Sequence, residues 1–235
     1  MDKYIIITGC SKGIGKSIAL EFANNGYNII GTYNASLIDI KKLKKEVEKI
    51  GVKFDYYNLD LLDDNSIINF VQEINQNYKK INILVNNASL SLDNELENKT
   101  SKEFLDVLKV NLVGPFSLIK GLKDKLEVVI NIASTDGINT YSKFNIDYSA
   151  SKAALINLTK SLKLALPNLK IIAICPNWVE TESIKEMNQE YLKDEMRRIR
   201  QKKLIKPKEV SQKIIEILNT SINSGEIVVM EDSNE

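Results

Sequence analysis

The chain has 235 residues, 43% of them hydrophobic and 27% charged, which is the composition of a globular protein that can bury a core. Its 32 Lys and Arg residues balance 31 Asp and Glu residues, and the net charge of +1 argues against general electrostatic binding to nucleic acid or to an anionic membrane. The chain has no histidine, which excludes His-dependent nucleophiles, His-ligated zinc and imidazole acid–base catalysis, so an enzymatic proton transfer must use Tyr, Lys, Asp, Glu or Cys.

Short runs rich in Ile and Val alternate with longer stretches of helical period, which is the pattern of crossover units in a parallel sheet. Strands are predicted at residues 4–8, 28–33, 53–58, 81–86, 128–133, 170–175 and 226–230. Helices are predicted at residues 14–25, 37–50, 64–79, 101–122, 148–165 and 207–219. Six of the strands are nearly continuously apolar, as expected when helices cover both faces of a sheet. The sequence therefore predicts a single α/β domain over residues 1–235 with a doubly wound, parallel, seven-stranded sheet.

A glycine-rich segment, TGCSKGIG at residues 8–15, follows the first predicted strand and opens the first helix. Its glycines allow a tight turn and a close approach of the backbone to a pyrophosphate, and the free N–H groups of a helix start attract negative charge. The spacing is G-x3-G-x-G instead of the commoner G-x-G-x-x-G. A glycine-rich turn that binds nothing is the alternative interpretation.

Polar residues also follow the ends of later strands. Asp60 ends the third strand, Asn87 follows the fourth and Ser134 the fifth, and the segment 176–181 closes the sixth. Because an open parallel sheet binds its ligands at the carboxyl ends of its strands, we expect these residues to face one crevice.

Tyr148 and Lys152 lie four positions apart on a predicted helix and therefore share one face of it. A lysine ammonium beside the hydroxyl favours the phenolate and would draw the pKa of Tyr148 from its ordinary value near 10 toward neutrality. Each unit of such a shift needs about 1.4 kcal/mol, which a close, partly buried cation supplies. Tyr148 would then act as a general acid and base without histidine. A Tyr and a Lys that merely cover a helix surface are the alternative, which Ser134 and the glycine loop disfavour.

The ordered set TGxxxGIG, NNA, Asn111, Ser134, YxxxK and PxxxxT resembles the short-chain dehydrogenase/reductase family in its compact single-domain form, over nearly the whole chain. The resemblance implies a Rossmann fold and hydride exchange with a nicotinamide cofactor. It implies that Tyr148 moves the proton of the substrate oxygen and that Ser134 steadies the same oxygen. It further implies that Lys152 tunes Tyr148 and binds the nicotinamide ribose, while Asn111 holds a water that extends a proton relay.

The resemblance also implies the residues that contact the cofactor. Asp60 is expected at the adenine edge, and Val179 and Thr181 at the nicotinamide carboxamide. A strand-end turn is the alternative for Asp60 and a helix cap the alternative for Thr181. The complete set of candidate cofactor-binding residues is Gly9, Ser11, Lys12, Gly13, Ile14, Gly15, Tyr33, Asn34, Asp60, Leu61, Asn87, Ala88, Tyr148, Lys152, Pro176, Val179 and Thr181.

The end of the second strand favours NADP(H) over NAD(H). It reads TYNAS at residues 32–36 and lacks the acid that would bind the adenosine ribose of NAD. The next acid, Asp39, fits a variant capping box at the following helix start. Lys12 in the glycine loop can meet the extra phosphate of NADP, with help from Lys41 or Lys42, and a solvated loop lysine is the alternative.

Two residues depart from the family pattern, because Ser89 replaces the glycine of NNAG and Asn177 replaces the glycine after the proline of the sixth strand. Asn tolerates a positive φ, so Asn177 is expected to keep the backbone path, whereas Ser89 is expected to narrow the space near the cofactor. Trp178, Tyr141 and Phe144 flank these segments and are candidates to border the substrate, with core packing as the alternative.

A charged segment at residues 180–206 lies between the sixth strand and the last helix and is the candidate lid over the crevice. It contains all of the arginines, Arg197, Arg198 and Arg200. Such a cluster can meet an acidic carrier protein or a coenzyme A phosphate, or it can form a solvated helix face.

The function expected from the resemblance is NADP(H)-dependent reduction of a carbonyl, with a 3-oxoacyl thioester on a carrier protein as the leading substrate. A sugar, polyol or xenobiotic carbonyl reductase is the alternative. A nucleotide-sensing regulator without turnover is a third reading, disfavoured because Tyr148 and Lys152 are both present. A homodimer or homotetramer is expected through the helices near 101–122 and 148–165.

The two cysteines, Cys10 and Cys175, form no CxxC pair, and we predict neither a metal site nor a redox pair. No apolar run reaches the roughly 18 residues of a membrane span, and the first apolar run turns into the glycine loop where a secretory signal would continue. A reduced cytoplasmic protein with no membrane or nucleic-acid partner is therefore expected.

Overall fold

The computed structural model describes residues 2–232, and within this range seven strands form one sheet in the order β3-β2-β1-β4-β5-β6-β7. All six neighbouring pairs are parallel. The strands are β1 (Tyr4–Ile7), β2 (Asn28–Tyr33), β3 (Phe54–Asn58), β4 (Ile81–Asn86), β5 (Leu126–Ile132), β6 (Lys170–Pro176) and β7 (Ile227–Met230). The predicted doubly wound, seven-stranded parallel sheet is confirmed, and the strand ends differ from the prediction by two residues at most.

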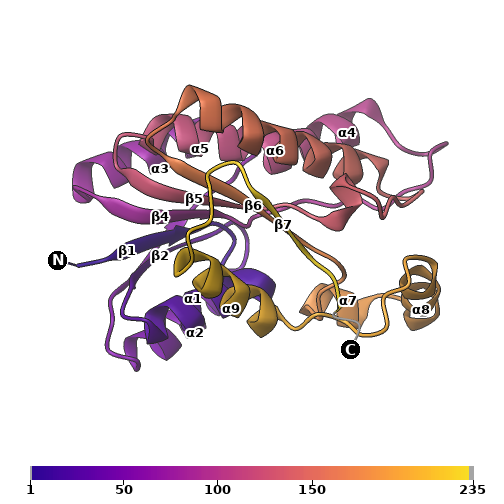
Figure 1. Ribbon diagram of the computed structural model, residues 1–235, viewed down its shortest axis with the longest axis horizontal. Helices are drawn as coiled ribbons and strands as arrows, with labels where there is room; N and C mark the ends of the chain where they lie inside the picture. Colours follow the sequence, from indigo (N-terminus) through magenta and orange to yellow (C-terminus); the bar gives the residue numbers. More distant parts are fainter. Residues whose placement is uncertain (1, 233–235) are drawn as a thin grey trace.

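Helices cover both faces of the sheet, with α1, α2 and α9 on one side and α3 to α6 on the other (Figure 1). One apolar cluster joins the sheet to Phe22 of α1 and Val210 of α9, and a second joins it to Phe70 of α3 and Leu118 of α5. The strands can be apolar throughout because neither face meets water. The helices are α1 (Gly13–Asn24), α2 (Leu37–Glu48), α3 (Asp64–Asn77), α4 (Ser101–Leu108), η1 (Lys109–Val113), α5 (Gly114–Leu122), η2 (Thr135–Gly137), α6 (Ile146–Ala165), α7 (Glu182–Glu186), α8 (Gln189–Arg198) and α9 (Pro207–Leu218).

The strand order reverses between β1 and β4, which lie side by side in the middle of the sheet. In a doubly wound sheet this reversal opens a crevice at the carboxyl ends of the central strands, because the two connections leave in opposite directions. The loops after β1, β4, β5 and β6 therefore converge at one place.

The single helix predicted over 101–122 is wrong in its middle. The chain forms α4, then one π-helical turn, η1, and then α5. Thr100 and Glu103 form a capping box that starts α4. Pro115 stands at the start of α5 and has no N–H to give to the carbonyl four residues earlier, which is a reason for the wider hydrogen-bond pattern just before it.

The capping box predicted with Asp39 is also wrong. Ser36 is the N-cap of α2 but its side chain makes no capping hydrogen bond. The Asp39 carboxylate lies 3.4 Å from the ammonium of Lys42, one helical turn along. Asp39 therefore pairs with Lys42 on the exposed surface of the helix and does not form the predicted capping box with Ser36.

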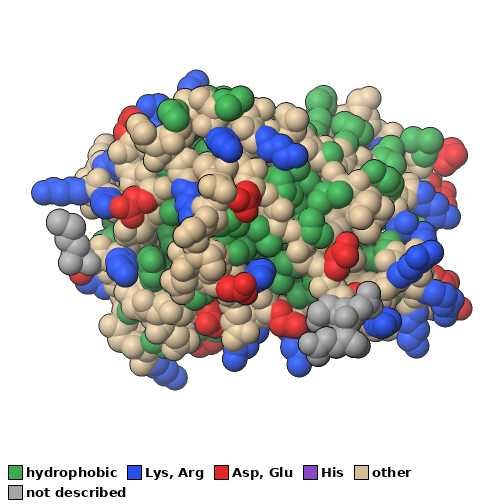
Figure 2. Space-filling view, viewed as in Figure 1, with side chains coloured by type: hydrophobic (Ala, Val, Ile, Leu, Met, Phe, Trp, Pro, Cys, Tyr) green, Lys and Arg blue, Asp and Glu red, His purple; other side chains and the backbone are tan. Residues whose placement is uncertain are grey.

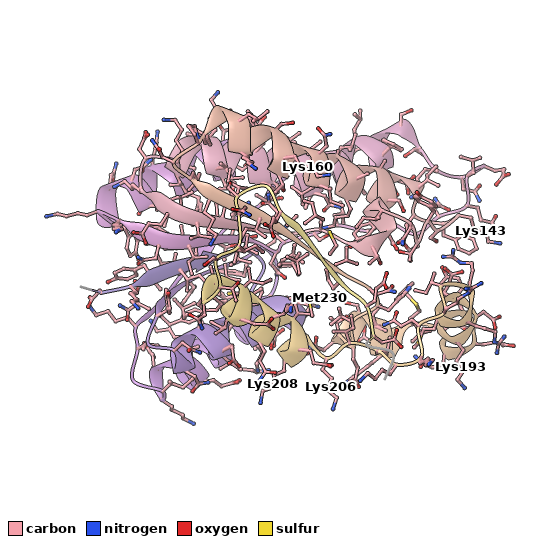
Figure 3. The ribbon with its side chains drawn as sticks, in the orientation of Figure 1. Lys143, Lys160, Lys193, Lys206, Lys208 and Met230 are labelled. Atoms are coloured by element: carbon pink, nitrogen blue, oxygen red, sulfur yellow. The ribbon has the colours of Figure 1, made fainter. Side chains whose placement is uncertain are left out.

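The candidate lid forms two short helices, α7 and α8, and returns to the sheet region through an isolated bridge between Val179 and Ile205. In Figure 1, α8 lies at the right end of the molecule, beyond α7. The ring of Tyr191 on α8 packs against Phe144 at a centroid distance of 5.7 Å, and Figure 3 places the neighbouring Lys143 at the same end as Lys193 of α8.

Hydrophobic side chains gather in the middle of the face drawn in Figure 2, around the edge strand β7. Of this strand, Val229 is exposed while its three neighbours are half-buried. No helix in residues 2–232 combines the length and the apolarity that crossing a membrane would need.

Candidate active site

The glycine loop has the backbone geometry that its sequence predicts. Gly9 and Gly13 adopt positive φ angles of 61° and 58°, which side chains other than glycine rarely tolerate. A Cβ on Gly15 would lie 2.6 Å from both the Asn87 amide nitrogen and the Gly9 carbonyl oxygen, so this position requires glycine. Lys12 is the N-cap of α1 in an extended conformation and is exposed.

The segment after β4 holds this loop in place. The Thr8 hydroxyl accepts hydrogen bonds from the backbone N–H groups of Asn87 and Ala88, both at 2.9 Å. The Asn87 amide donates to the carbonyls of Thr8 and Gly9 at 2.9 and 3.1 Å. The first and fourth strands thus end in one hydrogen-bonded unit, in which the Asn87 side chain supports the loop.

A cavity of about 690 Å³ lies at the carboxyl ends of β4, β5 and β6. The residues predicted from sequence that line it are Ile14, Asn87, Ser134, Tyr148, Lys152, Pro176, Val179 and Thr181. The distant segments that the motifs singled out therefore meet around one space.

A second cavity of about 470 Å³ includes Asn34 and Asp60 in its lining. One carboxylate oxygen of Asp60 accepts the Leu62 N–H at 2.9 Å, so Asp60 also forms the strand-end turn that was its alternative interpretation. Leu61 lies outside the lining of both cavities, and its side chain is buried in the core. Tyr33 packs edge-on against the ring of Tyr56 at a centroid distance of 6.0 Å.

Tyr148 and Lys152 project from α6 toward Ser134 at the end of β5. The Lys152 side chain is only 2% exposed, and its ammonium donates to the Ile132 carbonyl at 2.9 Å. The same ammonium lies 5.3 Å from the centroid of the Tyr148 ring. The predicted shared face of the helix is confirmed, with the ammonium above the ring.

The predicted acidification of Tyr148 is wrong for this structure. Burial raises the pKa of Tyr148, and the negative charge of Asp136 adds to the effect, while hydrogen bonding with Ser134 and Ser89 lowers it only in part. Burial also lowers the pKa of Lys152 to about 8. Loss of water is the largest cause of both pKa shifts, because desolvation disfavours the charged form of each group.

Asn111 lies on the π-helical turn, and its side chain is fully engaged. Its amide donates at 2.9 Å to the Leu90 carbonyl and to the Ser151 hydroxyl, while its oxygen accepts the Leu90 N–H at 2.8 Å. The Ser89 hydroxyl donates to the same oxygen at 3.2 Å. Asn111 thus ties the loop after β4 to α6, and Ser89 is one of the residues that line the cavity.

Asn177 does not adopt a positive φ, since Arg200 is the one non-glycine residue among residues 2–232 with that conformation. The expectation that Asn177 is tolerated for its positive φ is therefore wrong. Its side-chain oxygen instead accepts the Trp178 N–H at 3.1 Å and the Thr135 hydroxyl at 3.3 Å. These bonds join the ends of β5 and β6.

The start of the candidate lid rests on the glycine loop. The Glu182 carboxylate accepts the Gly13 N–H at 3.1 Å. Ser183, Ile184 and Met187 line the cavity. This segment therefore closes one side of the space in front of α1.

The arginines of this segment pair with acids of their own helix. Arg197 lies 3.0 Å from Asp194, and Arg198 lies 2.7 Å from Glu195. This pairing supports the interpretation as a solvated helix face. Arg200 occupies a left-handed turn just after α8.

Of the three aromatic residues predicted to border the substrate, Trp178 lines the cavity. Tyr141 is 64% exposed and donates to the Ile138 carbonyl, and Phe144 packs on Tyr191, so neither is part of the lining. Tyr141 and Phe144 lie between Ser134 and Tyr148 in the sequence, but the chain after η2 places their side chains outside the cavity.

Sequence reasoning missed Asp136, which also lines the cavity. Its carboxylate accepts the Thr140 hydroxyl at 2.7 Å, and burial raises its pKa. Its position two residues after Ser134 was the signal that could have identified it. It places a carboxyl group beside the phenol of Tyr148.

The backbone of the turn η2 packs directly against the backbone of α6 at Gly137. A Cβ on Gly137 would lie 2.5 Å from the Ala153 nitrogen and 2.6 Å from the Lys152 carbonyl carbon. Neither atom can move alone, so Gly137→Ala is expected to lower the free energy of unfolding by about 1–3 kcal/mol and to reduce turnover by displacing Ser134 from Tyr148. Urea unfolding and kcat measure the two effects, and an unchanged unfolding midpoint contradicts this packing.

The comparisons with known proteins agree with this arrangement. The family model described as short chain dehydrogenase matches residues 3–192. The chain is 31% identical over 220 residues to a 3-oxoacyl-[acyl-carrier-protein] reductase of Buchnera aphidicola, covering 91% of this chain and 88% of the relative. It is 30% identical over 235 residues to a reductase of the same name from Thermotoga maritima, covering 96% and 95%.

Among solved structures, a short chain dehydrogenase from Burkholderia cenocepacia in complex with NADP matches with a TM-score of 0.89 at 22% identity, over 97% of this chain and 96% of that one. This likeness concerns the fold. The family model spans well over half of the residues, and its match agrees with the parallel sheet, the glycine loop and the Tyr-Lys helix. The chain belongs to the short-chain dehydrogenase family of oxidoreductases.

Proposed function

We propose that this protein reduces a carbonyl group to an alcohol with NADPH, and that Tyr148 gives the proton to the substrate oxygen. The observation that carries the proposal is the convergence of Ser134, Tyr148 and Lys152 on one cavity that borders the glycine loop. Hydroxyl donors at this place can stabilise the negative charge that develops on a carbonyl oxygen.

The residues present fit a dinucleotide. The backbone of Gly9 lies so close to Ala88 that a Cβ on Gly9 would be 3.0 Å from the Ala88 Cα. Only glycine at this position leaves the backbone of the loop open to a phosphate. The Gly13 N–H at the start of α1 already donates to an anionic oxygen, that of Glu182. A pyrophosphate suits the same donors, since helix starts attract negative charge.

The bound cofactor supplies the hydride. Ser134 and Tyr148 orient the substrate oxygen, and Tyr148 transfers its proton to it. The raised pKa of Tyr148 keeps the phenol protonated at neutral pH, which is the form a proton donor needs. Lys152 holds positive charge beside the ring as the phenolate forms.

A 3-oxoacyl thioester is the leading substrate, because the relatives that are 30% and 31% identical carry the name 3-oxoacyl-[acyl-carrier-protein] reductase. Sugar, polyol and xenobiotic ketones are the alternative. Measuring NADPH consumption against a panel of acyl thioesters and ketones tests the proposal. NADPH binding without turnover on any member of the panel would instead identify a nucleotide-sensing regulator.

The preference for NADP(H) over NAD(H) rests on Lys12 and on the absence of an acid at residues 32–36. Lys12→Ala is expected to weaken NADPH binding roughly tenfold, or about 1.4 kcal/mol, and to change NADH binding little, because only NADPH carries the extra phosphate. Fluorescence titration with both dinucleotides measures this. Lys49→Ala, an exposed lysine at the far end of α2, is the control. Equal losses for NADPH and NADH would remove the phosphate assignment.

A homodimer or homotetramer through α4, α5 and α6 belongs to the same proposal. Leu105 and Leu164 on these helices are 63% and 82% exposed, and Phe116 is 41% exposed. Covering them with a second copy of the chain removes apolar surface from water. Light scattering of wild type and of Leu105→Lys tests the assembly.

We further propose that residues 180–206 form the lid of the cavity and that the protein is located in the cytoplasm.

A further inference from the structure

A buried ion pair lies one residue before the proposed proton donor. The ammonium of Lys99, between β4 and α4, is 2.9 Å from the carboxylate of Asp147 in the first turn of α6, and the two side chains are 3% and 0% exposed. Every other ion pair in residues 2–232 has a partner whose side chain is at least 43% exposed. Burying two charges is costly and adds little to stability, so this pair calls for a reason other than stability.

The start of α6 provides that reason. Its N-cap, Asn145, makes no capping hydrogen bond with its side chain, although the first backbone N–H groups of a helix have no partner within the helix. One of these N–H groups belongs to Tyr148, and it donates to the Asp147 carboxylate at 2.9 Å. The carboxylate that pairs with Lys99 therefore also fixes the backbone of Tyr148.

The other half of the pair fixes the loop that bounds the cavity. The Lys99 ammonium also donates to the carbonyl of Leu92. A second link lies nearby, where the Asn94 N–H donates to the Phe144 carbonyl at 2.9 Å. Within this loop, Ser91 and Asp93 line the cavity.

The cavity thus has Tyr148 on one wall and the loop at residues 90–93 on the other, and one buried pair joins the two walls. We propose that Lys99 and Asp147 are positioning residues that set the place of the Tyr148 phenol relative to the carbonyl of the substrate. This inference rests on the proposed function.

Removing the pair as a unit tests the proposal. The double variant Lys99→Met with Asp147→Asn leaves no unpaired buried charge, so its unfolding midpoint in urea is expected to stay near that of the wild type. Its kcat is expected to fall roughly tenfold to a hundredfold, because small displacements of a reacting group are enough to cost such factors. Its affinity for NADPH is expected to be retained, because the glycine loop does not touch the pair.

A single variant distinguishes an effect on the position of Tyr148 from an effect on stability. Asp147→Asn leaves the buried Lys99 ammonium without its carboxylate partner, so this variant is expected to have both a lower stability and a lower kcat. The double variant is expected to regain the stability but not the kcat. If kcat recovers together with stability, the pair is only structural and the proposal fails. The matched control is Lys102→Met with Asp106→Asn, an ion pair on α4 whose side chains are 83% and 28% exposed, and it is expected to leave kcat unchanged.

Hydrogen exchange gives a readout that needs no turnover. The amides of residues 146–152 are expected to exchange faster in the double variant than in the wild type, and those of α9 to stay unchanged. Unchanged exchange in residues 146–152 overturns the inference even if kcat falls. If the wild type reduces no carbonyl at all, the proposed function fails, and the exchange experiment still decides whether the pair orders Tyr148.

Discussion

Replacing Tyr148 by Phe is expected to lower kcat/KM for NADPH-linked carbonyl reduction on the order of 10² to 10⁴-fold, which is the range supplied by a positioned proton donor. The ring that lies under the Lys152 ammonium remains, since its centroid is 5.3 Å from that group in the wild type. The affinity for NADPH is therefore expected to stay close to its original value. Initial rates of NADPH consumption and a fluorescence titration measure the two quantities.

Tyr141→Phe is the matched control for this experiment. The Tyr141 hydroxyl donates to the Ile138 carbonyl, and its side chain is 64% exposed and outside the cavity lining. Its removal is expected to leave kcat/KM unchanged. Turnover that survives in Tyr148→Phe would remove the proton-donor role. A collapse of NADPH binding in the same variant would show that the Tyr148 hydroxyl is needed to bind the cofactor, because this variant keeps the ring.

Replacing Lys152 by Met is expected to lower kcat on the order of 10²-fold, because the phenolate that forms on Tyr148 loses the positive charge beside it. Met fills a similar volume with an apolar chain, so the fold is expected to survive. Steady-state rates at neutral pH measure the effect. A kcat within about twofold of the wild type contradicts a role of the ammonium in proton transfer.

The same substitution has a predicted pH dependence. Burial lowers the pKa of Lys152 from 10.5 to about 8, so between these two values the unfolded chain binds more protons than the folded chain. Stability therefore rises with pH through this window, and below pH 8 the full cost of burying the ammonium is present. From pH 7 to pH 9 the wild type is expected to gain about 1 kcal/mol relative to Lys152→Met.

The difference between the two proteins is the informative quantity. Burial raises the pKa of Cys10 and of Cys175 to about 12, and such raised acids lose stability as the pH rises above their ordinary value of 9. Both proteins carry these thiols. Loss of the Lys152 charge raises the pKa of Cys175 further, but the folded thiols stay protonated up to pH 9 in both proteins, so their contribution cancels in this window. Urea unfolding of both proteins at the two pH values measures the gain, and parallel pH profiles would contradict the lowered pKa of Lys152.

Local sequence pattern was sufficient to predict the fold and several of the residues that line the cavity, including Ser134, Tyr148 and Lys152. Runs such as residues 5–7 are apolar at consecutive positions, as expected of a strand that helices cover on both faces. The positive φ angles of Gly9 and Gly13 and the shared face of Tyr148 and Lys152 follow from residue type and helical spacing. These features depend on neighbours within a few positions, so the sequence alone could determine them.

Tertiary structure decided how the site behaves. The pKa of Tyr148 rises instead of falling, because the segments that close over it remove the water that would solvate a phenolate. Asn111 supports the loop with its side chain because a π-helical turn places it next to Leu90 and Ser151. Neither result follows from spacing along the chain.

The pairing of Lys99 with Asp147 joins residues 48 positions apart, and the contact of Glu182 with Gly13 joins residues 169 positions apart. Sequence determined the type of each of these side chains. Only the folded chain decides which charges meet and how much water each one loses, because desolvation depends on all of the surrounding segments and not on the residue itself.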